Sequence, residues 1–388
     1  MSTRQEFLPY ALPLIEEDDI AEVVDTLKSG WLAKGPKTTE FEKQFANYVG
    51  AKYAVALNSC TAALHLSLVA AGIGEGDEVI TTPMTFAASA NVVLHTGAKP
   101  VFVDIDPVTM NLDFTKIEEK ITPRTKAIIP VHIAGHPCQM DEIMAIARAH
   151  NLFVLEDAAH AVYTQYKGNL IGSMGNATAF SFYATKNLVT GEGGMVTTND
   201  EELYNKIRVM STHGMSRNAW NRYAEAGSWA YDIIAPGYKY NMCDIMAALG
   251  LTQLGKLERM QGLRQEIADH YNAEFGKLPE LEVPVELDYA RHAWHLYIIK
   301  LNLDKLSIDR GKFIEELKAE NIGTSVHFIP LHLQPYYRET FGYKPGDFPV
   351  AEGVFERIIS LPLYPKMSRQ DADDVVGAVK RVIGRFRS

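Results

Sequence analysis

The sequence predicts an α/β protein whose larger part contains a mostly parallel β-sheet and whose smaller C-terminal part is α+β. Three observations support this prediction. Short apolar segments typical of buried strands alternate with helical segments between residues 53 and 157. After about residue 240 a long helical stretch and a more mixed pattern replace this alternation. The chain of 388 residues is long for one simple core, so we expect two domains, 1–245 and 246–388.

Two amphipathic helices are expected before the alternation begins. Apolar residues recur at helical spacing in residues 16–28 and again in residues 39–49. Gly30 and Gly50 follow these segments, and glycine often ends a helix. The loop between the two helices carries an aromatic residue, Trp31.

The alternating part is expected to supply the core of the sheet. Short apolar runs predict strands at residues 53–57, 78–82, 100–104, 127–132 and 152–156. The segments between them predict helices at residues 62–71, 86–95, 112–120 and 140–150. Strands and helices in this order form parallel sheets that helices cover. Ligands of such sheets bind beyond the carboxyl ends of the strands.

The pattern after residue 240 predicts a second set of elements. A long helical stretch covers about residues 242–275. Beyond it we expect strands at 294–301 and 323–328, and helices at 312–319 and 371–386. Residues 212–235 contain few apolar runs and are expected to form a long loop.

Composition and charge exclude several classes of protein. The net charge of −10 disfavours sequence-independent binding of nucleic acid. No run of about 18 apolar residues could span a bilayer, and the first ten residues lack the apolar core of a signal peptide. Cys60, Cys138 and Cys243 are far apart, and no Cys/His metal-binding spacing occurs. We therefore expect a cytoplasmic protein that uses no metal and has no nucleic-acid or membrane partner.

A lysine, Lys186, stands in a glycine-rich turn between two apolar segments, residues 177–182 and 195–198. Most lysines are solvated, so an ordinary loop lysine is the simplest interpretation. A lysine in a partly desolvated pocket has a lowered pKa, however, and it can act as an amine nucleophile or form a Schiff base. We favour the second interpretation because other motifs indicate the same chemistry.

Three of these motifs follow predicted strands. The turn of residues 58–62 leads into a helix, where backbone N–H groups and the helix dipole favour a phosphate, although ordinary helix capping also explains it. Asp157 ends an apolar strand and could keep a cofactor's ring nitrogen protonated, or could cap a helix. Phe86 could stack on a flat cofactor or belong to the core.

Taken together, the motifs supply a phosphate site, a stacking ring, a carboxylate and an amine at the ends of successive strands. This set matches pyridoxal 5′-phosphate (PLP) and few other cofactors. A glycine-rich segment, residues 72–76, follows a helix and precedes a strand. That order is the reverse of a dinucleotide-binding turn, so NAD is disfavoured.

Several further motifs span nearly the whole chain. They are Ser29-Gly30-Trp31 with Gly35-Pro36, Gly76-Asp77-Glu78-Val79-Ile80, Glu156-Asp157-Ala158-Ala159-His160, Phe180-Ser181-Phe182, Lys186-Asn187 with Gly191-Glu192-Gly193-Gly194, and His213-Gly214. With them the chain resembles the DegT/DnrJ/EryC1/StrS family of PLP-dependent sugar aminotransferases, and the segment around Lys186 is the most specific. The resemblance implies PLP-dependent transferase fold type I, which is aspartate-aminotransferase-like, and PLP as cofactor.

The resemblance also assigns roles to particular residues. Lys186 would hold PLP as a Schiff base and later move a proton, and Asp157 would pair with the ring nitrogen. His160 stands where many members have Gln, and it would complete the catalytic groups near the ring face and the 3′ oxygen. Phe86 would stack on the ring. The residues implied to bind the phosphate are Thr61, Ala62 and Ser181.

A homodimer with shared active sites is implied as well. Residues 237–241 of the partner chain would complete the phosphate site, through either Lys239 or Asn241, since the segment departs from the commoner Gly-x-Asn-x-Arg pattern. Ala33 stands where many members have Thr. The candidates for contacts to substrate are Trp31, Lys34, His213, His327, Arg217 and Arg222.

The C-terminal motifs narrow the expected reaction. Residues 291–296, 323–328 and 361–363 resemble the UDP-4-amino-4-deoxy-L-arabinose aminotransferase branch, and related members that act on UDP-linked 4-keto-6-deoxy-N-acetylhexosamines share much of this pattern. We expect L-glutamate, which becomes 2-oxoglutarate, to aminate a keto carbon, C4, of a UDP-linked sugar for surface polysaccharide or glycan biosynthesis. Two alternatives are a PLP-dependent nucleotide-sugar dehydratase, whose branch replaces the lysine by histidine, and a non-catalytic regulatory or binding protein of the same fold. Lys186 and the intact set around it disfavour both.

Overall fold

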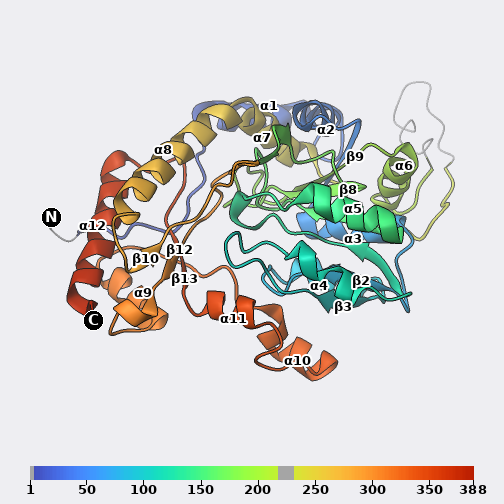
Figure 1. Cartoon of the computed structure of the whole chain (residues 1–388). Helices are drawn as coiled ribbons and strands as arrows, with labels where there is room; N and C mark the ends of the chain where they lie inside the picture. The colour runs from blue at the N-terminus through green and yellow to red at the C-terminus, as the bar shows by residue number, and fades with distance from the viewer. Residues whose placement is uncertain (1–3, 217–230) are drawn as a thin grey trace.

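The computed structural model describes residues 4–216 and 231–388, and Figure 1 labels its elements. Arg217 and Arg222 lie outside the described residues, as does most of the loop expected at residues 212–235. A seven-stranded sheet with helices on both faces forms the larger part of the molecule, and a three-stranded sheet with helices packed against it forms the smaller part (Figure 1).

The seven-stranded sheet has the strand order β1-β9-β8-β5-β4-β2-β3. Pairing is parallel from β3 through β2, β4 and β5 to β8, whereas β9 runs antiparallel to both β8 and β1. The mostly parallel sheet predicted from the sequence is therefore confirmed. The strands span Tyr53–Leu57 (β1), Glu78–Thr81 (β2), Lys99–Phe102 (β3), Thr125–Ile128 (β4), Phe153–Asp157 (β5), Ala177–Ser181 (β8) and Gly194–Thr198 (β9).

Successive side chains of these strands point to opposite faces, and helices cover each face. Val154 packs in a core with residues of α2 (Pro36–Val49) and α5 (Met140–His150). The next residue, Leu155, packs in a second core with residues of α3 (Cys60–Ala70), α4 (Ala88–His95) and α6 (Glu201–Met210). The helix α7 (Asp244–Gly255) contributes Ala247 to the first core, and α1 (Glu17–Ser29) packs against α7.

The smaller part is built on an antiparallel sheet of β10 (Leu281–Glu282), β12 (Tyr297–Leu301) and β13 (Ile358–Leu361). It shares a core with α8 (Leu257–Phe275), α9 (Arg310–Ala319) and α12 (Arg369–Phe386). The short helices α10 (Pro335–Phe341) and α11 (Pro349–Phe355) pack near Phe102 of β3.

The helix α8 joins the two parts. Leu257 and Met260, in its first turns, belong to the core of the large sheet, whereas Tyr271 and Phe275, in its last turns, belong to the core of the small sheet. The domain boundary expected between residues 245 and 246 stays a prediction.

Three expected elements differ in the structure. Residues 112–120 form two short 3₁₀ helices, Phe114–Lys116 and Glu118–Lys120, instead of one α-helix, and Asp113 caps the first of them by accepting the N–H of Thr115. The helical stretch 242–275 is interrupted at Lys256, whose φ of −114° is not helical, directly after Gly255. Residues 323–328 form only an isolated bridge between Ser325 and Ser360, not the expected strand.

Five strands were not predicted from the sequence. Three of them, β6 (Gln165–Tyr166), β7 (Asn169–Leu170) and β11 (Ala290–Arg291), form a third small sheet, and the other two, β10 and β13, belong to the sheet of the smaller part. The strands β6, β7, β10 and β11 have two residues each, which is too short to show an alternating pattern. Among residues 4–216 and 231–388, no helix is long and apolar enough to cross a membrane.

Candidate active site

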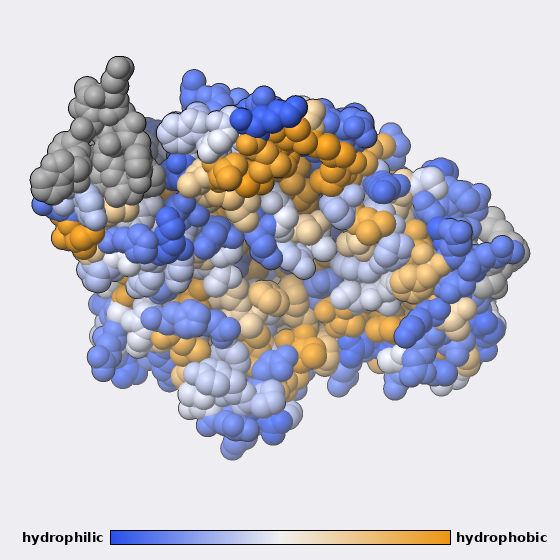
Figure 2. Space-filling view, turned by 180° about the vertical axis from the view of Figure 1, so that it is seen from behind, coloured by the Kyte–Doolittle hydropathy of each residue, from blue (hydrophilic) through white to orange (hydrophobic). Residues whose placement is uncertain are grey.

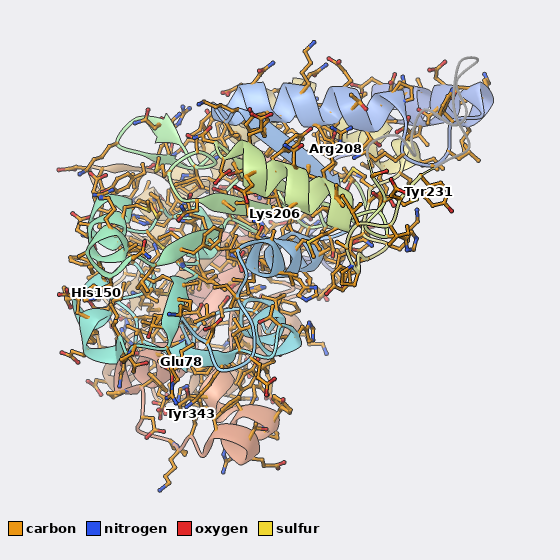
Figure 3. The ribbon with its side chains drawn as sticks, turned by 90° about the vertical axis from the view of Figure 1, so that its right-hand side faces the viewer. Glu78, His150, Lys206, Arg208, Tyr231 and Tyr343 are labelled. Carbon is orange, nitrogen blue, oxygen red and sulfur yellow. The ribbon has the colours of Figure 1, made fainter. Side chains whose placement is uncertain are left out.

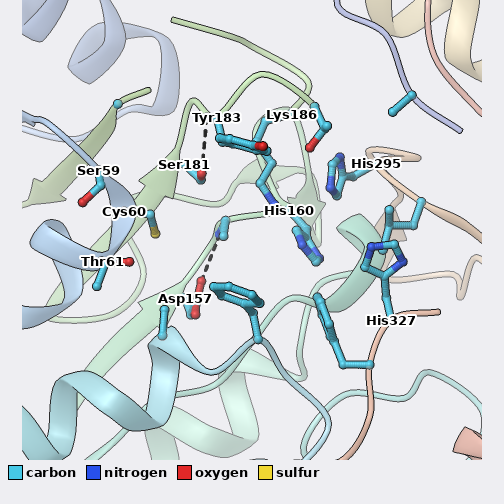
Figure 4. A pocket seen from close by; sticks show the side chains of 18 of the residues that line it. Ser59, Cys60, Thr61, Asp157, His160, Ser181, Tyr183, Lys186, His295 and His327 are labelled. Atoms are coloured by element: carbon cyan, nitrogen blue, oxygen red, sulfur yellow. Dashed lines mark hydrogen bonds between the residues drawn. The ribbon is translucent and has the colours of Figure 1, made fainter. Parts of the chain in front are cut away.

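A cavity of about 310 Å³ lies at the carboxyl ends of β1, β5 and β8. Glu78 begins β2 and His150 ends the helix that leads to β5, so these two labelled side chains in Figure 3 mark the opposite, amino-terminal edge of the sheet. The cavity position therefore agrees with the rule for parallel sheets. Figure 4 shows the labelled lining residues Ser59, Cys60, Thr61, Asp157, His160, Ser181, Tyr183, Lys186, His295 and His327.

Lys186 lies in the connection between β8 and β9 and lines the cavity. This connection needs glycine at position 193, where φ is +157° and a Cβ would collide with neighbouring side chains. Removal of the amine from water lowers the pKa of Lys186 to about 8, although the nearby Cys60 and Asp157 act in the opposite direction. The amine is therefore closer to its nucleophilic form at neutral pH than an exposed lysine would be.

Asp157 is the last residue of β5, and its carboxylate is buried at the cavity wall. One oxygen accepts a hydrogen bond from Ser89 Oγ at 2.7 Å, and the other accepts the backbone N–H of Ala159 at 3.1 Å. Burial raises the pKa of Asp157, whereas these two donors and Lys186 act to lower it. Turns follow Asp157 instead of a helix, so it does not cap a helix.

The turn between β1 and α3 forms another wall of the cavity. Ser59 caps α3 by accepting the N–H of Ala62 at 3.1 Å. Gly194 of β9 lies directly behind this turn, since a Cβ on Gly194 would come within 2.5 Å of the backbone nitrogen of Cys60. The positive end of the α3 dipole and the remaining N–H groups of its first turn suit a phosphate. Thr61 lines the cavity, whereas Ala62 is buried behind it.

Three histidines line one side of the cavity: His160, His295 and His327. His160 Nδ1 accepts the backbone N–H of Ala134 at 3.2 Å, and His327 Nδ1 lies 2.8 Å from Ser360 Oγ. Burial and the nearby Lys186 hold the pKa of His160 well below its ordinary value and lower the pKa of His327 to about 4. These imidazoles are therefore neutral at physiological pH.

Ser181 and Phe86 both line the cavity. Ser181 ends β8, and its Oγ accepts the N–H of Tyr183 at 3.4 Å. Phe86 is 63% exposed although it lines the cavity, and its ring centroid lies 6.1 Å from that of Phe328. An exposed ring at a cavity wall is free to stack on a flat ligand.

Besides Ala62, five of the described residues expected at the site do not line this cavity: Trp31, Lys34, His213, Lys239 and Asn241. Lys34 Nζ pairs with Glu42 at 2.8 Å, and Trp31 is 54% exposed. His213 is exposed and donates its backbone N–H to Tyr238. Asn241 donates its side-chain amide to the carbonyl of Met242 at 3.1 Å, and its Oδ1 is buried without a partner among the described residues. Their proposed contacts stay predictions.

The sequence analysis assigned no role to several lining residues, among them Glu192 and His295. Tyr10, Phe328 and Leu363 also line the cavity. His295 and Phe328 lie in the segments that resemble the UDP-arabinose branch, but neither segment shows a periodicity or spacing that indicates chemistry. Their presence in the site depends on the packing of the small sheet against the large one.

The residues in this cavity fit PLP. An amine, a buried carboxylate, a helix N-terminus with hydroxyls and an exposed aromatic ring face one space. These groups match the aldehyde, the ring nitrogen, the phosphate and the flat ring of the cofactor, respectively.

The model of the DegT/DnrJ/EryC1/StrS aminotransferase family matches residues 13–380. The spore coat polysaccharide biosynthesis protein SpsC of Bacillus subtilis is 60% identical to this chain over 381 residues, which are 98% of each protein. A protein of Methanocaldococcus jannaschii, MJ1066, is also 60% identical, over 99% of this chain and 100% of its own length.

Two solved structures support the same relationship. The PLP form of Spr1654 from Streptococcus pneumoniae is 37% identical, with a TM-score of 0.91 over 98% of this chain and 99% of its own. PseC of Helicobacter pylori, an aminotransferase involved in the biosynthesis of pseudoaminic acid, is 30% identical, with a TM-score of 0.91 over 98% of this chain and 100% of its own.

Proposed function

Because the chain belongs to the DegT/DnrJ/EryC1/StrS aminotransferase family, we propose that it transfers the amino group of L-glutamate to a keto carbon of a nucleotide-linked sugar. The chain is an aminotransferase, and PLP is its cofactor. The observation that carries the proposal is the convergence of Lys186, Asp157 and the Ser59–Thr61 turn in one cavity.

Each of these groups has a distinct task in the proposed reaction. When bound, PLP draws electrons from the carbon that exchanges the amino group and so stabilises negative charge there. Lys186 Nζ would hold the cofactor and, when free, would take up and return the proton that this carbon loses. The buried Asp157 carboxylate would keep the ring nitrogen protonated. Thr61, Ser181 and the first turn of α3 would bind the phosphate, and Phe86 would stack on the ring.

The substrate is proposed to be a UDP-linked sugar with a keto group at C4. The names of SpsC and PseC connect relatives of this chain with polysaccharide and sugar biosynthesis. His295 and His327, from the segments that resemble the UDP-4-amino-4-deoxy-L-arabinose branch, line the cavity. Binding of the distant nucleotide can supply energy that orients the keto carbon beside Lys186. The reaction would serve surface polysaccharide or glycan biosynthesis.

The alternatives lack comparable support. A nucleotide-sugar dehydratase of this family would carry histidine in place of the lysine, whereas Lys186 is present and lines the cavity. A non-catalytic binding protein has no need for a lysine amine whose pKa is lowered beside a buried carboxylate.

We propose in addition a cytoplasmic homodimer whose active sites are shared. Figure 2 shows an apolar patch on the surface over α1, and the exposed apolar residues of this helix and the following loop are Ile20, Val24, Leu27, Trp31 and Leu32. Exposed apolar patches support association. Asn241 does not line the cavity of its own chain, which agrees with a contribution to the site of the partner chain.

The test of the proposed function begins with spectroscopy. The purified protein should be yellow, its visible spectrum should change when L-glutamate is added, and borohydride should fix the cofactor on Lys186. Label found elsewhere by peptide mapping would end the assignment of Lys186. Specificity constants for UDP-4-keto, dTDP-4-keto and dTDP-3-keto sugars, with a free sugar as control, then test the substrate. Preference for the 3-keto sugar or equal use of the free sugar would refute the UDP-4-keto assignment alone.

A further inference from the structure

Asn187, which follows Lys186, has a side-chain orientation that the surrounding protein determines. Its Nδ2 donates to the backbone carbonyl of Ala293 at 2.7 Å and to Gln261 Oε1 at 3.2 Å. A backbone carbonyl can only accept, so the amide cannot turn over without placing two oxygens against each other. Asn187 Oδ1 is therefore the atom that faces His295 Nδ1, at 3.1 Å.

This orientation determines the tautomer of His295. An amide oxygen can only accept a hydrogen bond, so His295 Nδ1 must carry the hydrogen. A neutral imidazole has one hydrogen, and Nε2 then holds a lone pair. No residue of the described chain provides a hydrogen bond to this Nε2, and His295 lines the cavity. The ring therefore offers the cavity an acceptor.

The neighbouring His160 has the opposite polarity. Its Nδ1 accepts the N–H of Ala134, which can only donate, so the hydrogen of the neutral ring is on Nε2. The carbonyl of the same Ala134 accepts the backbone N–H of His295 at 3.0 Å, so one residue contacts both histidines through its two backbone polar groups. The two ring centroids lie 4.4 Å apart with a tilt of 39°, on the same side of the cavity (Figure 4).

Both rings stay neutral because of their surroundings. Burial holds the pKa of His295 well below its ordinary value, and His160, Lys186, Arg264 and His327 act in the same direction. A neutral acceptor attracts a group that carries a hydrogen. It repels a carboxylate or phosphate oxygen, which has only lone pairs to offer.

We propose that His295 is a specificity residue that accepts, through Nε2, a hydrogen bond from a hydroxyl group of the sugar substrate, and that Asn187 is the positioning residue that holds the required tautomer. The inference rests on the proposed function, since the hydroxyl belongs to the ketosugar. Because Nε2 of His295 is an acceptor, we expect the anionic groups of glutamate and of the diphosphate to bind away from His295.

The first experiment observes the tautomers without substrate. Two-bond ¹H–¹⁵N spectra of the full-length holoenzyme, labelled with ¹⁵N-histidine, distinguish the two neutral forms from imidazolium. His295→Asn and His160→Asn assign the signals. At neutral pH we expect hydrogen on Nδ1 of His295 and on Nε2 of His160. In Asn187→Leu, the His295 signal should shift to a mixture of forms. Hydrogen on Nε2 of His295 in the wild-type protein would overturn the proposal.

The second experiment distinguishes loss of the Nε2 acceptor from a structural effect of changing His295. His295→Asn retains an amide that can donate to Asn187 Oδ1, but it removes the acceptor from the cavity. We expect about a tenfold loss in kcat/KM for the UDP-4-ketosugar, with little change in the rate of the spectral change caused by glutamate. The exposed residue His150, changed to Asn, is the matched control and should leave both rates unchanged.

Two outcomes of the second experiment count against the proposal, and they differ from a failure of the proposed function. A loss confined to the glutamate reaction would mean that His295 binds the amino donor instead. Equal losses in both reactions would assign His295 a general structural role. A wild-type enzyme that aminated no ketosugar would refute the proposed function and with it the hydroxyl contact, while the spectra would still decide the tautomers.

Discussion

Lys186 and Asp157 illustrate how the cavity changes the chemistry of single residues. Burial lowers the pKa of the lysine and raises the pKa of the aspartate, and the attraction between the two groups limits both shifts. Neither shift follows from the residue types, since an exposed lysine and an exposed aspartate would titrate near their ordinary values. The lowered pKa of Lys186 has a direct consequence for its reactivity.

The pH dependence of Lys186 labelling in the apoenzyme tests this lowered pKa. Only the deprotonated amine reacts with an acylating reagent, so its reactivity rises as the pH passes upward through the pKa. We expect half-maximal labelling near pH 8, because Lys186 has a pKa of about 8, and not near pH 10.4, where an exposed lysine titrates. Lys206, an exposed lysine of α6 visible in Figure 3, is labelled in the same reaction and quantified by mass spectrometry as a control. Parallel pH profiles of the two lysines would contradict the prediction.

Asp157→Asn should lower turnover on the order of a hundredfold, because a neutral amide cannot stabilise a charge that the carboxylate stabilises in a buried site. The amide can still bond to Ser89 and Ala159, so the fold and the retention of PLP should change little. Rapid-reaction kinetics and cofactor content measure the two effects. Ser89→Ala, which leaves the charge in place, is the control and should retain most of the activity. Near-normal turnover of Asp157→Asn would assign the aspartate a structural role.

At the scale of elements, the Ser59–Thr61 turn, which we propose as the phosphate turn, depends on β9 as much as on α3. Ser59 caps α3 at its N-terminus, and Gly194 allows the backbone of β9 to pass close to the backbone of Ser59 and Cys60. The connection after β8 turns the chain back, so β9 runs antiparallel to β8 and lies between β8 and β1 in the sheet. The same connection carries Lys186, so one loop arranges both the amine and the phosphate turn.

Gly194→Ala should weaken both stability and cofactor binding. The added methyl would lie 2.4 Å from the carbonyl carbon of Ser59, so the turn or the strand must move. We expect a loss of about 1–3 kcal/mol in the free energy of unfolding, measured with urea, and faster release of PLP. Gly262→Ala is the matched control, because Gly262 lies in α8 with open space around it, and alanine should stabilise that helix. Unchanged PLP release in Gly194→Ala would show that the turn is not the phosphate site.

At the scale of the whole molecule, the cavity uses both parts of the chain. Lys186 and Asp157 come from the large part, whereas His295 lies two residues before β12 of the small sheet. The helix α8 has buried residues in both cores and so couples the two parts. Relative movement of the parts would therefore change the distance between His295 and Lys186.

Mixed dimers test the proposed sharing of active sites. A Lys186→Ala chain and an Asn241→Ala chain should each be inactive as homodimers. Co-assembled, they should recover about half of the wild-type activity per dimer, because one of two sites regains both residues. In the control, a doubly substituted chain pairs with a wild-type chain and leaves no intact site. Activity of the control equal to that of the mixed dimer, or a fully active monomer in sedimentation, would contradict shared sites.

Much of the fold and part of the site could be predicted from the sequence. The strand of residues 53–57 and the helix of residues 140–150 have the expected bounds, because their apolar periods are local. Lys186 and Asp157 share one cavity, as expected for residues at the carboxyl ends of strands. The expected strand at residues 323–328 was wrong, because its backbone partner depends on the distant Ser360.

The sequence by itself determined which segments become strands and helices, and which polar residues stand at strand ends, since both are properties of neighbouring residues. Only the tertiary structure decided how the polar groups are paired. Asn187 and Ala293 are 106 positions apart, yet their hydrogen bond determines which nitrogen His295 presents to the cavity. The physical reason is that hydrophobic periodicity is a local property of the chain. Donor and acceptor partners are set by the packing of separate elements around a shared cavity.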